Sequence, residues 1–179
     1  MTAVEFFVDE SRRRDYLLCA AVVADHDLDS ARKVMRDLKP RNRNRLHLKD
    51  ETRNRDRLIA DFVRLRPVAQ AHIFVGRMQG TRRTEREVRS QCLDALACCA
   101  ADAGATRILV ESCSQDKQDK AALTGALARV DALDRVRVAI DAPTSHELLW
   151  AADLIAWAYG TGGALRNLVA PLVTVHTVV

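Results

Sequence analysis

Aromatic side chains are scarce in this sequence, since Phe, Trp and Tyr together make up 4% of its 179 residues. So few rings provide no evident platform on which nucleic-acid bases could stack. The five cysteines are an odd number, and Cys98 and Cys99 are adjacent within a helical pattern. Neither a disulfide framework nor a zinc-binding spacing is therefore visible, and we expect reduced, mostly buried thiols.

Long apolar runs are missing as well. No run approaches the roughly 20 residues that span a bilayer. The first residues also lack the basic flank and apolar stretch of an export signal. We therefore expect a cytoplasmic protein without a membrane partner.

The sequence does contain enough apolar residues for one substantial core. With 48% hydrophobic residues in 179 positions, we predict a single domain over residues 1–179. The 28 Lys and Arg against 24 Asp and Glu give a net charge of +4, an excess that matters only where it is clustered. Most basic residues are Arg, which holds phosphate in a bidentate fork but is also favoured by high-GC genomes. The clusters are Arg12–Arg14, Arg41–Arg45 and Arg82–Arg83.

The order of the expected elements indicates an α/β fold. The first two strands form a hairpin, whereas the later ones alternate with helices, which predicts a mixed five-stranded sheet flanked by helices. Apolar runs and alternation predict strands at 4–8, 16–24, 70–78, 107–113 and 136–141. Helices are expected over 29–38 and 54–66, from Thr84 to Gly104, over 117–133 and from 145, with capping boxes at Thr84–Glu87 and Thr144–Glu147. The tail, 172–178, either adds an edge strand or pairs with another subunit, so a homo-oligomer stays open.

Two carboxylates lie at the ends of apolar strands, Asp9 after Val4–Val8 and Glu111 at the end of 107–111. If these strands are parallel neighbours, both side chains emerge at the same edge of the sheet, where α/β folds bind ligands. Carboxylates a few ångströms apart repel, and a bound cation makes such a pair tolerable at neutral pH. A turn role for Asp9 and solvent exposure of Glu111 are the alternatives. Strand alternation also leaves open that Glu10 serves in place of Asp9.

Asp153 is the third candidate, because it stands alone in the apolar helix 148–158. A buried carboxylate there is costly unless it is paired or metal-bound. The alternative is a backbone cap or an ion pair with an Arg such as Arg107. His146, seven residues earlier, is an auxiliary phosphate or metal contact, whereas His47 is a weaker candidate because a His in a polar loop is more often a surface residue. We interpret His26, His72 and His176 as structural or exposed.

The segments Phe7–Ser11, Leu46–His47 and Ala152–Ala158 together resemble the Domain of Unknown Function 3800 family. Its members open with a strand ending in Asp-Glu-Ser-Gly, carry a Leu-His pair and finish with a Leu-Gln-x-Ala-Asp-Leu-x-Ala helix. The resemblance spans most of the chain and implies a ribonuclease-H-like fold. Arg12, Trp150 and Glu111 stand where the family prefers Gly, prefers Gln and frequently has Asp.

The resemblance implies a nuclease that hydrolyses phosphodiester bonds by a two-metal-ion mechanism. Asp9, Glu111 and Asp153 would hold Mg²⁺ or Mn²⁺, and His47 would orient water or protonate the leaving group. The residues expected to contact nucleic acid, of a type that the sequence does not specify, are Arg12, Arg13, Arg14, Arg45 and His146. Two alternatives stay open: a non-catalytic ribonuclease-H-like module that binds nucleic acid or a protein partner, and a metal-dependent phosphoesterase for small molecules.

Overall fold

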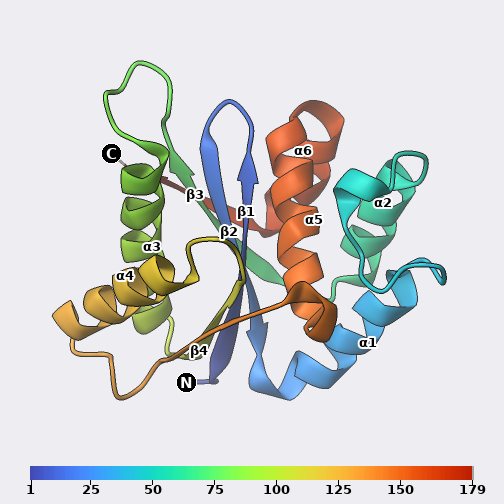
Figure 1. Ribbon diagram of the computed structural model, residues 1–179. Helices are drawn as coiled ribbons and strands as arrows, with labels where there is room; N and C mark the ends of the chain where they lie inside the picture. Colours follow the sequence, from blue (N-terminus) through green and yellow to red (C-terminus); the bar gives the residue numbers. More distant parts are fainter. Residues whose placement is uncertain (179) are drawn as a thin grey trace.

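The computed structural model describes residues 1–178, which form one mixed sheet between two layers of helices (Figure 1). The strand order is β5-β4-β1-β2-β3-β6, and β2 runs antiparallel to its neighbours while the other pairs are parallel. The strands are β1 (Val4–Arg12), β2 (Tyr16–Ala24), β3 (Gln70–Gly76), β4 (Ala105–Glu111), β5 (Arg137–Asp141) and β6 (Val173–Val178).

The predicted α/β fold with a mixed sheet flanked by helices is confirmed, but the count of five strands is wrong. The sheet has six strands, because the tail pairs in parallel with β3 of the same chain and becomes an edge strand. An apolar tail at the surface has exposed backbone donors and acceptors, and pairing with β3 satisfies them on one side.

Two helical layers bury the two faces of the sheet (Figure 1). One face packs against α1 (Leu28–Leu38), α2 (Arg55–Leu65), α5 (Glu147–Thr161) and α6 (Gly163–Val169). The other packs against α3 (Glu85–Asp102) and α4 (Asp116–Arg129). Short 3-10 turns lie at Asp25–Asp27, Leu48–Asp50, Pro143–Ser145 and Ala170–Leu172. None of the helices in residues 1–178 combines the length and the apolar composition that a membrane span requires.

The alternation of side chains along β1 determines which residues reach each layer. Phe7 packs into the core on the α5 side, whereas Phe6 and Val8 pack into the core on the α3 side. Successive residues of a strand point to opposite faces, so Asp9 belongs to the α5 side and Glu10 to the α3 side. Strand β2 is buried almost throughout because it lies between β1 and β3 and is covered on both faces, which explains its continuous apolar run.

Several expected boundaries differ from the structure. Strand β1 does not end at Asp9 but continues to Arg12, because β2 supplies pairing partners as far as the Arg12–Tyr16 pair. The expected strand 70–78 ends at Gly76, and the expected helix 117–133 ends at Arg129, before a turn in which Asp131 has a positive φ of 53°. All five cysteines are free, but only Cys19 and Cys92 are fully buried.

The two predicted capping boxes have opposite outcomes. The Thr84 hydroxyl accepts a hydrogen bond from the Glu87 amide, and the Glu87 carboxylate accepts one from the Thr84 amide, so that capping box is confirmed. The Thr144–Glu147 capping box is wrong. Helix α5 begins after His146 without a side-chain cap, and Glu147 forms an ion pair with Arg36 at 2.9 Å instead.

Candidate metal centre

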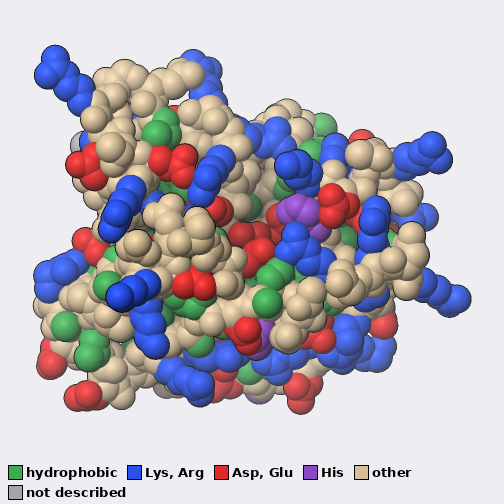
Figure 2. All heavy atoms as spheres, in the orientation of Figure 1, with side chains coloured by type: hydrophobic (Ala, Val, Ile, Leu, Met, Phe, Trp, Pro, Cys, Tyr) green, Lys and Arg blue, Asp and Glu red, His purple; other side chains and the backbone are tan. Residues whose placement is uncertain are grey.

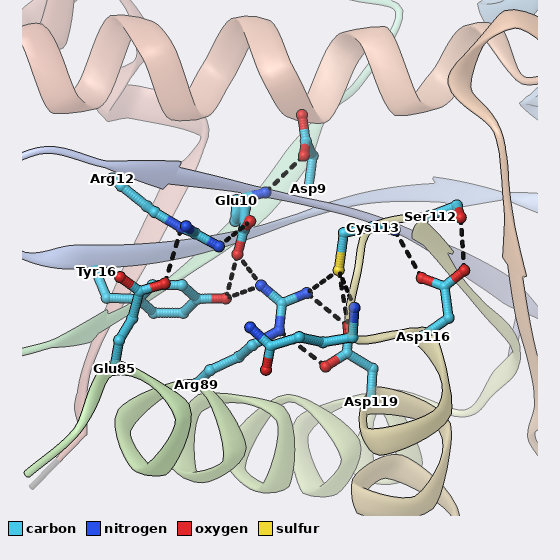
Figure 3. A network of polar contacts seen from close by, with 11 residues as sticks. Asp9, Glu10, Arg12, Tyr16, Glu85, Arg89, Ser112, Cys113, Asp116 and Asp119 are labelled. Atoms are coloured by element: carbon cyan, nitrogen blue, oxygen red, sulfur yellow. Dashed lines mark hydrogen bonds and ion pairs between the residues drawn. The ribbon is translucent and has the colours of Figure 1, made fainter.

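Asp9 and Glu10 point away from each other across β1. Figure 3 shows the Asp9 carboxylate directed toward α5 and the Glu10 carboxylate directed toward α3. Asp9 is paired with Cys19 of β2, whose side chain lies in the core on the α5 side. Asp9, rather than Glu10, therefore shares a face of the sheet with Asp153.

Strands β1 and β4 position Asp9 beside Glu111. The two strands are parallel neighbours with Val8 paired to Val110, so the next residue of each strand continues the same register. Helix α5 crosses this face and brings Asp153, which is 9% exposed. The pKa of Asp9 lies well above its usual value, because burial desolvates the carboxylate and because the charges of Glu111 and Asp153 are close. The structure thus brings the three predicted carboxylates together.

Two basic residues from the loop before α2 contact this cluster. The Nη1 atom of Arg45 is 3.2 Å from Oε1 of Glu111, and Nδ1 of His47 is 3.2 Å from Oδ2 of Asp153. The Leu48 amide donates to the same Asp153 oxygen at 3.0 Å. The hydrogen bond with Asp153 raises the pKa of His47, although burial opposes the shift. Asp153 is therefore held by this loop and not by Arg107, which pairs with Glu5 at 2.6 Å.

The carboxylates are nevertheless more widely spaced than the ligands of a single ion. Within residues 1–178, the only three His, Cys, Asp or Glu side chains whose ligand atoms all lie within 4.8 Å of one another are His72, Cys99 and His176. Those residues belong to the α3 side of the sheet. An ion held by all three carboxylates at once would therefore require their side chains to turn inwards.

A fourth carboxylate, Asp141, extends the row and was missed in the sequence. It is paired with Glu111 in the β4–β5 register, and its Oδ2 is 2.8 Å from Nε2 of His146. That hydrogen bond is the main reason why the pKa of Asp141 lies below its usual value. The sequence does contain a pattern that indicates this residue, because Asp141 ends an apolar strand just as Glu111 does. His146 thus contacts the row of carboxylates through Asp141 and not through Asp153.

An open cleft of about 370 Å³ lies between Asp153 and the β1–β2 hairpin, and it is lined in part by Arg13, His47, Asp153 and Trp157 but not by Asp9 or Glu111. The Arg13 and Arg55 guanidinium groups lie 5.1 and 4.6 Å from the centre of the Trp157 ring, within the range of cation–π contacts. Figure 2 shows acidic side chains in a hollow in the middle of this face, with His beside them and Lys and Arg around them.

The three consecutive arginines of the hairpin have different surroundings. Arg13 lies against Trp157 in the cleft, where Gly160 of α5 permits a close approach, because a Cβ there would lie 3.2 Å from Cδ of Arg13. Arg12 also lines the cleft, but its guanidinium pairs with Glu10 and Glu85. Arg14 donates to Gln79 at 3.2 Å and does not line the cleft.

The sequence also gave no indication of a buried ion-pair network on the opposite face, which Figure 3 shows. Arg89 of α3 is 2% exposed and donates to both carboxylate oxygens of Asp119 at 2.8 and 2.6 Å. It also contacts the Glu10 carboxylate and the Tyr16 hydroxyl, the latter at 2.9 Å. This network anchors the β1–β2 hairpin and α4 to α3, directly behind the carboxylate cluster.

Together, the fold and the site define an α/β protein with a cluster of carboxylates at the carboxyl ends of neighbouring parallel strands. No protein-family model matches the chain, and a comparison with curated proteins also finds no match.

Proposed function

We propose that this protein is a metal-dependent nuclease with a ribonuclease-H-like fold, which resembles the Domain of Unknown Function 3800 family and hydrolyses phosphodiester bonds with two metal ions. The observation that carries the proposal is the meeting of Asp9, Glu111 and Asp153 on one face of the sheet. They come from two neighbouring strands and from the helix that covers them, at the edge where α/β folds bind their ligands.

The chemistry of the donor groups fits Mg²⁺ or Mn²⁺, because these cations prefer oxygen ligands. The raised pKa of Asp9 supports the same interpretation, since it reports uncompensated negative charge at a desolvated position. Arg45 offsets only part of that charge, through Glu111. When bound, the metal ions would supply Lewis-acid stabilisation of phosphate oxygens and an acidified water.

The side chains around the carboxylates provide the remaining functions. The raised pKa of His47 favours the imidazolium, which can donate a proton to a leaving-group oxygen, and its side chain lines the cleft. Arg13, which lines the cleft, and Arg55, which also lies against the Trp157 ring, carry positive charge that suits a phosphate backbone. Because the cleft offers a single indole ring, Trp157, we expect backbone-led binding with little sequence preference.

One observation favours a non-catalytic module that binds nucleic acid or a protein partner. Arg45 pairs with Glu111, while His47 and the Leu48 amide both contact Asp153, so two of the carboxylates have partners within the chain. A cluster that satisfies itself in this way needs no cation to be stable. In that case the cleft would bind phosphates through basic lining residues such as Arg13 and Lys49, without a metal ion.

The experiment that separates these functions is a panel of DNA, RNA, hybrid and nucleotide substrates in Mn²⁺, with the Asp9→Asn variant beside the wild-type protein. We expect cleavage of at least one polynucleotide, its loss in Asp9→Asn, and saturable Mn²⁺ binding by calorimetry that the variant lacks. Glu85→Gln is the control, because Glu85 is a nearby carboxylate that pairs only with Arg12 at the surface.

The proposal is abandoned if wild-type protein binds neither Mg²⁺ nor Mn²⁺ saturably, or if Asp9→Asn cleaves as fast as wild type. A metal-independent complex with a steep salt dependence would instead identify a simple phosphate-binding module. Cleavage of nucleotides alone would identify a small-molecule phosphoesterase.

A further inference from the structure

Three side chains with metal-binding atoms meet on the α3 face of the sheet, away from the carboxylates. His72 lies on β3, His176 on β6 and Cys99 on α3. His176 is paired with Phe74, two residues after His72, so both rings project from the same face of neighbouring strands. Their ligand atoms and the Cys99 sulfur all lie within 4.8 Å of one another.

The two imidazoles are held in place by packing. The Phe6 ring stacks on His72 with centroids 5.9 Å apart, and the Phe74 ring stacks on His176 at 4.6 Å. His72 is 8% exposed, and its Nε2 lies 3.3 Å from the side-chain amide of Gln70. A metal-binding His usually engages its second ring nitrogen in such a contact, which fixes the ring orientation. The amide of Gln70 can present its oxygen by a simple flip.

Neither imidazole is expected to carry a proton on both nitrogens. Burial lowers the pKa of His72, as does the neighbouring His176, and burial also lowers the pKa of His176. The neutral ring is the form that ligates metals. Nδ1 of His72 faces Nε2 of His176 at 3.0 Å, where the two neutral rings can share a single hydrogen.

We propose that His72, Cys99 and His176 bind a transition-metal ion of the Zn²⁺ type, at a site distinct from the carboxylate cluster. Two nitrogens and a sulfur suit Zn²⁺ and exclude Mg²⁺, which takes oxygen ligands. From ordinary Zn–N and Zn–S lengths, tetrahedral ligands are about 3.3 Å apart for two nitrogens and about 3.6 Å for nitrogen and sulfur. The two histidines already have nearly this spacing, and Cys99 needs to approach by at most about 1.2 Å.

Binding at this site joins three elements that are distant in the sequence. Burial raises the pKa of Cys99 to about 11, so its thiol releases a proton to solvent when the metal–sulfur bond forms. The ion would fasten the edge strand β6 to β3 and to α3. Three protein ligands leave a fourth position for water, as in zinc sites that are open to solvent.

The test is a Co²⁺ titration of the full-length protein, prepared without a polyhistidine tag and stripped with a chelator. Co²⁺ reports a cysteine ligand through its thiolate-to-cobalt charge-transfer absorption. We expect this band in the wild-type protein, its displacement by Zn²⁺ and its persistence in excess Mg²⁺. Cys99→Ser and His176→Gln should each weaken Co²⁺ binding by more than about 100-fold, since loss even of an outer partner commonly costs 10–100-fold.

Cys98→Ser is the matched control, because Cys98 is the adjacent but exposed thiol and should leave the band unchanged. Asp9→Asn should also keep the band, so failure of this site and failure of the proposed nuclease site are told apart. The proposal is overturned if no band forms, if Cys99→Ser retains it, or if Cys98→Ser loses it. His176 lies on the edge strand and is less buried than His72, so a folded His176→Gln with undiminished Co²⁺ affinity would also overturn it.

Discussion

Asp9 and Glu10 are consecutive residues whose carboxylates lie on opposite faces of the same strand (Figure 3). Asp9 faces Glu111 and Asp153 and has a raised pKa, whereas Glu10 pairs with the buried Arg89 and accepts a hydrogen bond from the Tyr16 hydroxyl at 2.8 Å. The ion-pair network of Arg89 thus holds the β1–β2 hairpin on the α3 side of the sheet. On the α5 side, the charge of the Asp9 carboxylate is not compensated. Functional sites commonly combine a destabilising charge of this kind with surrounding residues that hold it rigidly in place.

The first prediction concerns the stability of the metal-free protein. In EDTA, Asp9→Asn should raise the melting temperature, because the substitution removes a desolvated charge that lies beside two others. Stabilising substitutions of this kind commonly contribute about 0.5–2 kcal/mol. Because the folded pKa of Asp9 is raised, the cost in stability begins where the carboxylate ionises in the unfolded chain and reaches its full size above the folded pKa. The advantage of Asn should therefore be absent below about pH 4, grow as the pH rises toward the folded pKa, and stay constant above it.

Asp141→Asn is the control for this prediction. Asp141 occupies the same row of carboxylates, but its pKa is lowered by the hydrogen bond with His146, so its charge is favourable in the folded state. Its substitution should not raise the melting temperature at neutral pH. A loss of stability in Asp9→Asn, or an equal gain in both variants, would show that charge crowding at Asp9 is not the cause.

The second prediction tests the buried network behind the site. Arg89→Met should destabilise the protein by about 3–5 kcal/mol, because Asp119, which is 2% exposed, would keep a buried charge without its partner. Arg129→Met removes an exposed ion pair with Asp94 and should cost less than about 1 kcal/mol. Urea denaturation of both variants gives the comparison. Similar costs for the two would mean that the Arg89 network does not hold the hairpin.

Parts of this site followed from local patterns in the sequence. An apolar strand that ends in a carboxylate, as at Glu111, indicates both the strand and the edge of the sheet where the side chain emerges. A lone Asp in an apolar helix indicates Asp153 in the same way. These patterns are local because the period of a strand or helix fixes which face a residue takes.

Other parts depend on contacts between distant segments and have no local signal. Arg89 lies in a helix segment rich in charged residues and looks like a solvent-exposed side chain until α3, α4 and the hairpin are placed together. His72 and His176 are 104 residues apart and face each other only because the tail joins the sheet beside β3. The choice between Asp9 and Glu10 likewise required knowledge of which helix covers which face.

The third prediction uses the capping box at the start of α3. The hydrogen bond from the Thr84 amide is the main reason why the pKa of Glu87 lies below its usual value. A lowered carboxylate pKa contributes stability that is complete above the unfolded pKa and lost as the pH falls through the folded pKa. Glu87→Gln should therefore weaken the protein at neutral pH but not at low pH. Melting temperatures measured across the acid range would reveal the convergence, and a constant difference at all pH values would contradict it.

The last prediction distinguishes two adjacent arginines. Arg13 lies in the cleft against Trp157, whereas Arg14 binds Gln79 outside it, so only Arg13 is placed to contact a phosphate of a strand that enters the cleft. Each phosphate contact contributes about 0.7–0.9 to the slope of log affinity against log salt concentration. Arg13→Ala should lower this slope by about that amount for a single- or double-stranded ligand. Arg14→Ala carries the same change in net charge and should leave the slope unchanged. Filter binding in chelator isolates this electrostatic part from metal binding. An equal decrease in both variants would show that net charge, and not the cleft, sets the affinity.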